Sequence, residues 1–197
     1  MNSHTINKTM DYGELHLIIG PMMSGKSTEL LRRLFNESVI GVKCIYINHQ
    51  SDTRSKEGFS THNPLYKEKL SKESGVTFVS AKDLSTVDVS EYDVIGIDES
   101  QFFNSLVEPV LHWVDDLHKT VIVSGLNGDK RRKSIGCITG LIPHMDSCTF
   151  LKAYCQLCAE KKIKRNAIFS LKFGEGDDVG GKDKYIPLCR QCFNHTS

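Results

Sequence analysis

The sequence has no long apolar run, no strong excess of one charge and no apolar core within its first twelve residues. None of its runs approaches the roughly 18 apolar residues that a membrane-spanning helix needs. Its 25 lysines and arginines balance 24 acidic residues, so the net charge of +1 gives no bias toward nucleic acids or anionic membranes. Residues 1–12 are polar and lack the apolar core of a signal peptide. We therefore expect a cytoplasmic protein with a disordered leader over residues 1–12, and neither a membrane nor a nucleic-acid partner.

Disulfides are also not expected, because the seven cysteines are odd in number and no export signal accompanies them. Four of them form two C-x-x-C pairs, Cys155 with Cys158 and Cys189 with Cys192, separated by 30 residues. Four thiolates suit a tetrahedral zinc ion and leave no open position, so we expect one structural zinc per chain. The pattern leaves disulfides, an iron–sulfur cluster or unrelated thiols open as alternatives.

A phosphate-binding loop is present between an apolar run at residues 15–19 and a helical pattern at residues 28–35. It fits the pattern G-x-x-x-x-G-K-[ST], in which backbone N–H groups surround phosphates and the lysine reaches the β- and γ-phosphates. The hydroxyl of its last residue can bind Mg²⁺. The predicted ATP-binding residues of this loop are Gly20, Pro21, Met22, Met23, Ser24, Gly25, Lys26 and Ser27.

An apolar run at residues 92–97 ends in two adjacent acids, Asp98 and Glu99. In proteins with a phosphate-binding loop, a strand of this kind supplies the aspartate that holds Mg²⁺. The second carboxylate is then placed to act as a general base on an attacking hydroxyl or water. The pair predicts Mg²⁺-assisted phosphoryl transfer rather than nucleotide binding alone.

Strand and helix patterns alternate up to about residue 147. One of the predicted helices covers residues 104–118, and its Trp113 packs either in the protein core or at a subunit contact. Such alternation predicts an α/β domain with a mostly parallel sheet and helices on both faces. Residues 149–197 are richer in Cys, Gly and Lys, and they predict a small β-rich zinc-binding domain. We therefore divide the chain into an ATP-binding domain at residues 13–148 and a zinc and lasso domain at residues 149–197.

The sequence allows two interpretations for each of three charged segments. Asp52 and Arg54 follow a predicted strand at its ligand-binding end, where Arg54 either touches phosphate or lies in solvent. The run 130–133 either neutralises transferring phosphate or is a solvated loop. The run 161–165 resembles a nucleic-acid contact but lacks interleaved aromatic residues, which favours a solvated face.

Together these motifs resemble the type II thymidine kinases, the family that combines a phosphate-binding loop with zinc. The resemblance covers roughly residues 13–193 and includes segments 20–30, 52–54, 97–103, 126–129 and 180–185 with both cysteine pairs. It implies ATP-dependent 5′-phosphorylation of thymidine, and of deoxyuridine, by a homotetramer that thymidine triphosphate inhibits. It also implies a lasso loop, hung from the zinc site, that closes over the nucleoside.

The resemblance assigns roles by matching position. Glu99 would be the base, and Ser27 and Asp98 would serve Mg²⁺. ATP binding would also involve Asp52, Arg54 and Gln101. The nucleoside pocket would comprise Met22, Phe102, Leu126, Lys130, Asp178, Val179, Gly180 and Tyr185. The sequence departs from the common family pattern at Ser100, Asn127, Lys130 and Ile135.

Two other functions are compatible with a phosphate-binding loop. One is an ATPase that acts on nucleic acid through a zinc module, against which the near-neutral charge counts. The other is a non-catalytic nucleotide-binding regulator, against which the adjacent acids Asp98 and Glu99 count.

Overall fold

The computed structural model describes residues 12–51, 75–172 and 184–196. Several residues singled out from the sequence lie outside the described residues. They are residues 1–11 of the leader, Asp52, Arg54, Asp178, Val179 and Gly180.

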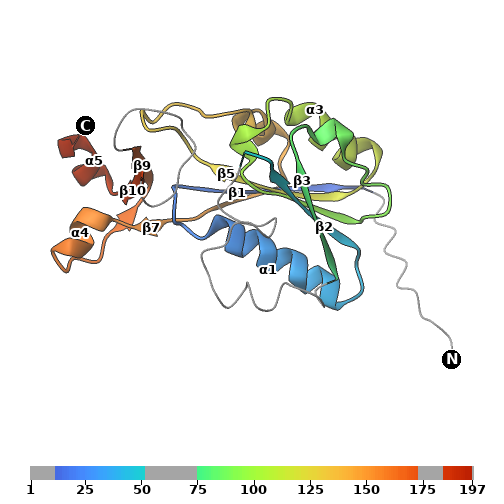
Figure 1. Ribbon diagram of the computed structural model, residues 1–197, viewed down its shortest axis with the longest axis horizontal. Helices are drawn as coiled ribbons and strands as arrows, with labels where there is room; N and C mark the ends of the chain where they lie inside the picture. The colour runs from blue at the N-terminus through green and yellow to red at the C-terminus, as the bar shows by residue number, and fades with distance from the viewer. Residues whose placement is uncertain (1–11, 52–74, 173–183, 197) are drawn as a thin grey trace.

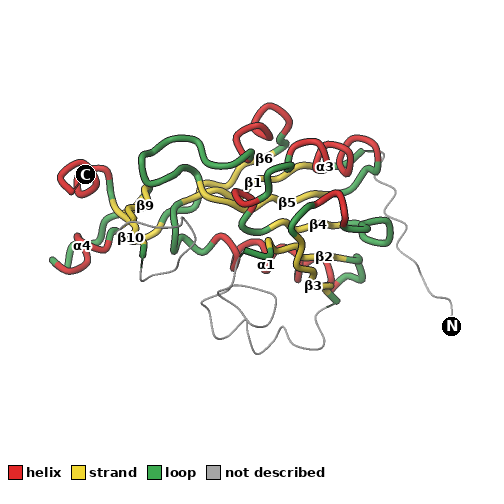
Figure 2. The backbone as a smooth tube through the Cα atoms, turned by 45° about the horizontal axis from the view of Figure 1, so that its top comes forward, coloured by secondary structure: helices red, strands yellow, loops and turns green. Residues whose placement is uncertain are grey.

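Six strands form one sheet, in which they lie side by side (Figure 2). Every pair of neighbouring strands runs parallel. Their order across the sheet is β3-β2-β4-β5-β1-β6. In chain order they are β1 (Glu14–Gly20), β2 (Cys44–His49), β3 (Val76–Ala81), β4 (Val94–Ile97), β5 (Thr120–Leu126) and β6 (Ser147–Phe150). The predicted mostly parallel sheet is confirmed.

Helices cover both faces of this sheet, as predicted (Figure 1). Helix α1 (Lys26–Val39) buries Leu30, Leu31 and Leu34 against one face. The opposite face is covered by α3 (Val107–Leu111), a π-helical turn (His112–Asp116) and 3-10 segments at Leu84–Thr86 and Ile138–His144. Because both faces are covered, the central strands are apolar nearly throughout, which is typical of parallel sheets.

The helix expected over residues 104–118 is shorter than the apolar pattern suggested. It begins at Val107, and the π-helical turn ends it at Asp116. Trp113 is buried in the core, which decides between the two roles considered for it. Among the described residues, no helix has the length and apolar character to cross a bilayer.

A small module with its own apolar core follows the sheet and lies at one end of the molecule (Figure 1). It holds two antiparallel two-stranded sheets, so its β-rich character is confirmed. Its elements are β7 (Ala153–Tyr154), α4 (Gln156–Glu160), β8 (Asn166–Ala167), β9 (Phe169–Lys172), β10 (Tyr185–Leu188) and α5 (Arg190–Thr196). The predicted division after residue 148 falls inside β6, which pairs with β1 up to Phe150.

Candidate active site

The phosphate-binding loop connects β1 to α1 and has the backbone geometry that its glycines predict. Gly25, directly before the helix, has a φ of 86°, which is the left-handed region that favours glycine. Only glycine fits at position 20, because a Cβ there would lie 2.5 Å from the carbonyl oxygen of Leu151. The loop therefore leads directly into the N-terminus of a 14-residue helix, where free N–H groups favour anions.

Lys26 bends back over the loop that precedes it. Its Nζ donates a hydrogen bond to the carbonyl oxygen of Pro21 over 2.8 Å, and the residue is buried. The Ser24 hydroxyl donates to the same carbonyl oxygen over 2.8 Å. The ammonium group is thus already held at the loop, where an incoming phosphate would meet it.

Asp98 directly follows β4, and its carboxylate is buried and held by three hydrogen bonds. Tyr46 Oη donates to Oδ2 over 2.6 Å, and Ser124 Oγ donates to Oδ1 over 2.8 Å. The backbone N–H of Glu99 also donates to Oδ1, over 2.9 Å. Neither Tyr46 nor Ser124 was singled out from the sequence. The available signal was a hydroxyl within the apolar part of each of two strands.

Glu99 adopts a left-handed backbone, with a φ of 49°, which is uncommon for a residue other than glycine. Its side chain accepts a hydrogen bond from the amide nitrogen of Gln101. The amide oxygen of Gln101 accepts in turn from the backbone N–H of Leu126 over 3.2 Å. Gln101 therefore connects the expected base to the strand end that carries Leu126.

Ser100, a departure from the family pattern, fits because Gly125 faces it. A Cβ on Gly125 would lie 2.3 Å from Ser100 Oγ. The Ser100 hydroxyl is fully buried and has no hydrogen-bond partner among the described residues. The side chain of Ser100 therefore fits because residue 125 is glycine and has no side chain at that place.

The carboxyl ends of β4, β5 and β1 bring the predicted groups together, because these strands are neighbours in the sheet. Gly20 is the direct register partner of Leu126. Phe102 lies beside the ring of His49, with centroids 5.8 Å apart, and burial lowers the pKa of that histidine. Strand ends of open α/β sheets are the usual ligand-binding edge.

The small module supplies two further contacts at this edge. The Met22 backbone N–H donates to Ser170 Oγ on β9 over 2.9 Å. Asn127 Nδ2, just past β5, donates to the carbonyl oxygen of Ile168 over 3.1 Å. Tyr185 opens β10 and is buried, with Lys172 Nζ 5.9 Å from its ring centroid.

The cationic run 130–133, for which phosphate neutralisation and a solvated loop were both considered, lies in the loop at residues 127–133. The Asp129 carboxylate accepts hydrogen bonds from the backbone N–H groups of Arg131 and Lys133, over 2.8 and 2.7 Å. Arg132 then points to the small module, with its guanidinium 5.2 Å from the ring centroid of Phe193. Arg132 therefore contacts aromatic rings of the small module, and neither interpretation of the run anticipated this contact.

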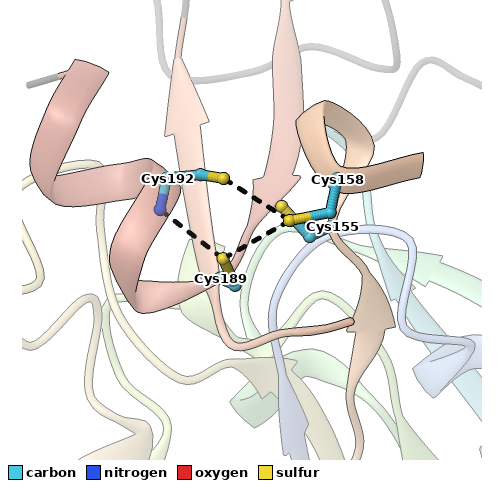
Figure 3. A group of neighbouring side chains, drawn as sticks. All are labelled: Cys155, Cys158, Cys189 and Cys192. Carbon is cyan, nitrogen blue, oxygen red and sulfur yellow. Dashed lines mark hydrogen bonds between the residues drawn. The ribbon is translucent and has the colours of Figure 1, made fainter. Parts of the chain in front are cut away.

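The four predicted cysteines come together in the small module (Figure 3). Their sulfur atoms all lie within 4.8 Å of one another. Cys155 directly precedes α4 and Cys158 lies within it, whereas Cys189 lies between β10 and α5 and Cys192 lies within α5. A cluster of four such sulfurs can hold a tetrahedral metal ion.

The thiols of this cluster do not ionise independently. Burial raises the pKa of Cys189, but hydrogen bonds from the Cys192 N–H, the neighbouring thiols and Arg165 outweigh it, and the pKa is about 6. The hydrogen bond with Cys158, with burial second, raises the pKa of Cys192 to about 12. Negative charge therefore gathers on one sulfur, and a bound cation is what would allow all four to be thiolates.

Comparison with known proteins gives a consistent result. A family model described as "Thymidine kinase" matches residues 13–193. The thymidine kinase of raccoon poxvirus is 38% identical over 188 residues, covering 93% of this chain and 98% of the viral one. Thymidine kinase a of Arabidopsis thaliana is 38% identical and covers 93% of this chain and 76% of its own. The cytosolic thymidine kinase of Bos taurus is 38% identical, with 92% and 72% covered. The similarity spans both the large sheet and the small module.

Proposed function

The chain belongs to the thymidine kinase family, and from this premise we propose that it transfers the γ-phosphoryl group of ATP to the 5′-hydroxyl of thymidine. The observation that carries the proposal is the position of Asp98 and Glu99 at the same sheet edge as the phosphate-binding loop. Phosphoryl transfer needs a phosphate cradle, a metal ion and an oriented nucleophile, and this edge offers groups suited to each.

Glu99 is the proposed general base. Its carboxylate accepts from Gln101, which itself is held by the Leu126 N–H, so its position depends on two neighbouring strand ends. A base must lie within hydrogen-bond reach of the hydroxyl it deprotonates, and restricting its side chain favours that geometry. The Lys26 ammonium and the helix N-terminus would stabilise charge on the transferring phosphate.

Ser27 and Asp98 are the proposed magnesium residues. A hydroxyl and a carboxylate are oxygen donors of the kind that Mg²⁺ binds, alongside water and the oxygens of ATP. When bound with ATP, Mg²⁺ neutralises charge that develops on the phosphates. The remaining proposed ATP contacts are the loop from Gly20 to Ser27 with Asp52, Arg54 and Gln101.

The nucleoside pocket is proposed to lie between the loop after β1 and the small module. This proposal is supported by the register pair of Gly20 with Leu126, which starts the loop that carries Met22 beside Leu126, and by the hydrogen bond from the Met22 backbone N–H to Ser170 on β9. The proposed lining residues are Met22, Phe102, Leu126, Lys130 and Tyr185. The proposed backbone contacts, Asp178, Val179 and Gly180, belong to the segment that lies outside the described residues.

The small module is proposed to hold one structural zinc ion, and the division into an ATP-binding part and a zinc and lasso part is likewise our proposal. Four thiol sulfurs within 4.8 Å suit tetrahedral Zn²⁺, and four protein ligands leave no position for a reacting water. By family likeness we further propose a homotetramer, feedback inhibition by thymidine triphosphate and a cytoplasmic location, the last supported by the bovine relative's name.

A panel of nucleosides with ATP tests the proposal against its alternative, an ATPase driven by nucleic acid. Thymidine, deoxyuridine, deoxycytidine and single-stranded DNA are each incubated with enzyme, Mg²⁺ and ATP, and nucleoside monophosphate and ADP are measured. We expect monophosphate from thymidine and from deoxyuridine, with ADP in equal amount. ADP release stimulated by single-stranded DNA, without any monophosphate, would instead support the alternative.

A further inference from the structure

The carboxylate of Asp98 has most of its acceptor positions occupied by fixed donors. An ionised carboxylate offers about four lone-pair positions, two on each oxygen. Within the described part of the chain, Oδ1 receives Ser124 Oγ and the Glu99 N–H, whereas Oδ2 receives Tyr46 Oη alone. One acceptor position is therefore left, and it is on Oδ2.

We propose that Tyr46 is a positioning residue for the kinase reaction, which together with Ser124 fixes the Asp98 carboxylate so that the free position of Oδ2 would be available to a magnesium ion. The inference rests on the proposed role of Asp98 in metal binding. It adds two residues, on β2 and β5, that no motif of the sequence connects with the reaction.

The burial of both hydroxyls supports a specific role for this arrangement. Tyr46 and Ser124 each have 0% relative exposure, and Asp98 has 1%, so water does not compete for these hydrogen bonds. A buried hydroxyl loses solvation unless it has a partner, so the two donors and the carboxylate hold each other in one geometry. The 2.6 Å distance from Tyr46 Oη to Oδ2 is short, as expected for a hydroxyl that donates to an ionised carboxylate.

Packing keeps the tyrosine ring in place independently of its hydroxyl. The Tyr46 ring lies 5.3 Å from that of Phe78 on β3, and it belongs to the core under α1. Tyr46→Phe therefore removes the donor and leaves the ring contacts. Outer hydrogen bonds to ligating side chains typically change metal affinity 10- to 100-fold when they are lost.

Metal affinity, rather than activity, is the decisive measurement. Mn²⁺, a substitute for Mg²⁺, is titrated calorimetrically into full-length enzyme saturated with a non-hydrolysable ATP analogue, and the analogue alone is the blank. We expect the Mn²⁺ dissociation constant to rise 10- to 100-fold in Tyr46→Phe, while the metal-free affinity for the analogue changes less than twofold. Tyr92→Phe, a second hydroxyl removal on the opposite face of the sheet, is expected to leave the Mn²⁺ affinity within twofold of the unmodified protein.

Asp98→Asn separates failure of this inference from failure of the proposed function. If Asp98→Asn weakens Mn²⁺ binding and Tyr46→Phe does not, the positioning role of Tyr46 is wrong and the metal role of Asp98 stands. If neither variant changes the affinity, Asp98 is not a metal residue and both proposals fall. Should Tyr46→Phe not fold, as judged by circular dichroism, Ser124→Ala decides. A loss of tenfold or more supports the positioning of Asp98 by these hydroxyls, and unchanged affinity overturns it.

Discussion

The backbone N–H of Met22 donates a hydrogen bond to Ser170 Oγ over 2.9 Å, although 148 positions separate the two residues in the chain. Met22 lies inside the phosphate-binding loop, and Ser170 is buried on β9 of the small module. The loop that would hold ATP is therefore tied directly to the module that would enclose the nucleoside. We therefore expect that a displacement of the small module would also shift the phosphate-binding loop.

Ser170→Ala removes this tie with little change in side-chain volume. We expect KM for thymidine to rise about fivefold, because one hydrogen bond contributes about 1 kcal/mol. KM for ATP should change less, since the other N–H groups of the loop remain. Ser147→Ala, which removes a hydroxyl from β6, is the matched control. An unchanged KM for thymidine in Ser170→Ala would contradict the role given to this contact.

Glu99→Gln tests the proposed base. The amide keeps the shape of the side chain and an oxygen that can accept from Gln101, but it cannot take a proton. We expect kcat to fall by about 10² to 10⁴, the usual contribution of a general base, with ATP affinity within twofold of the unmodified protein. Glu108→Gln, an exposed change on α3, should leave kcat unaltered. A rate for Glu99→Gln equal to that of the control would remove Glu99 as the base.

Most of the fold could be predicted because each central strand of a parallel sheet is a short apolar run with a turn at its end. The phosphate-binding loop, the acid pair and the cysteine pairs were visible because their spacing is local. Boundaries were less accurate: the division expected after residue 148 falls inside β6, which pairs with β1, whereas β7 pairs with β8 inside the small module. Pairing partners decide such a division, and they lie far away in the sequence.

The contacts of Tyr46, Ser124 and Arg132 could not be predicted for the same reason. The hydrogen-bond partner of a hydroxyl within a strand depends on the neighbouring strand, which here places a carboxylate against it. Arg132 stands in a run of four cations that gave no sign of which one turns toward aromatic rings. Local periodicity reports the face on which a residue lies, and it does not report the partner across a strand or between modules.

Gly125 and Ser100 make a matched pair that can be tested by exchange. Gly125→Ala alone places a methyl group 2.3 Å from Ser100 Oγ, and we expect a loss of about 1–3 kcal/mol in the free energy of unfolding, as for other overpacked sites. Ser100→Gly combined with Gly125→Ala should recover most of that loss, because it removes the closest clash. Urea unfolding of Gly125→Ala, of Ser100→Gly and of the double variant measures the coupling. Equal losses in the single and double variants would show that Ser100 is not the obstacle.

Metal removal tests the module that carries the cysteine cluster. We expect one zinc per chain by elemental analysis of reduced protein. Cys155→Ser should lose that zinc and raise KM for thymidine more than KM for ATP, because the cysteines hold β10 and α5 beside the proposed nucleoside pocket. Cys148→Ser, an exposed cysteine on β6, is the control and should retain the metal. Full zinc content in Cys155→Ser would disprove the proposed ligand set.

Arg132 provides the sharpest contrast between neighbouring residues. Its guanidinium lies 5.6 Å from the ring centroid of Phe169 and 5.2 Å from that of Phe193, and its Nη1 donates to Asn194 Oδ1 over 3.1 Å. Arg131 carries the same charge and is also exposed, and its backbone N–H donates to Asp129 Oδ1. The two arginines therefore differ in what their side chains contact rather than in charge.

Arg132→Ala should loosen the loop after β5 from the small module, whereas Arg131→Ala should not. Contacts of a cation with aromatic rings contribute about 0.5–1 kcal/mol each at exposed sites, so we expect a combined loss of about 1–2 kcal/mol at this junction. Hydrogen–deuterium exchange of β9 and of residues 126–133 should accelerate in Arg132→Ala, and KM for thymidine should rise several-fold. If phosphate neutralisation were instead the role of this run, KM for ATP would rise in both variants. Unchanged exchange in Arg132→Ala would show that Asp129 and the Asn127 contact hold the loop without it.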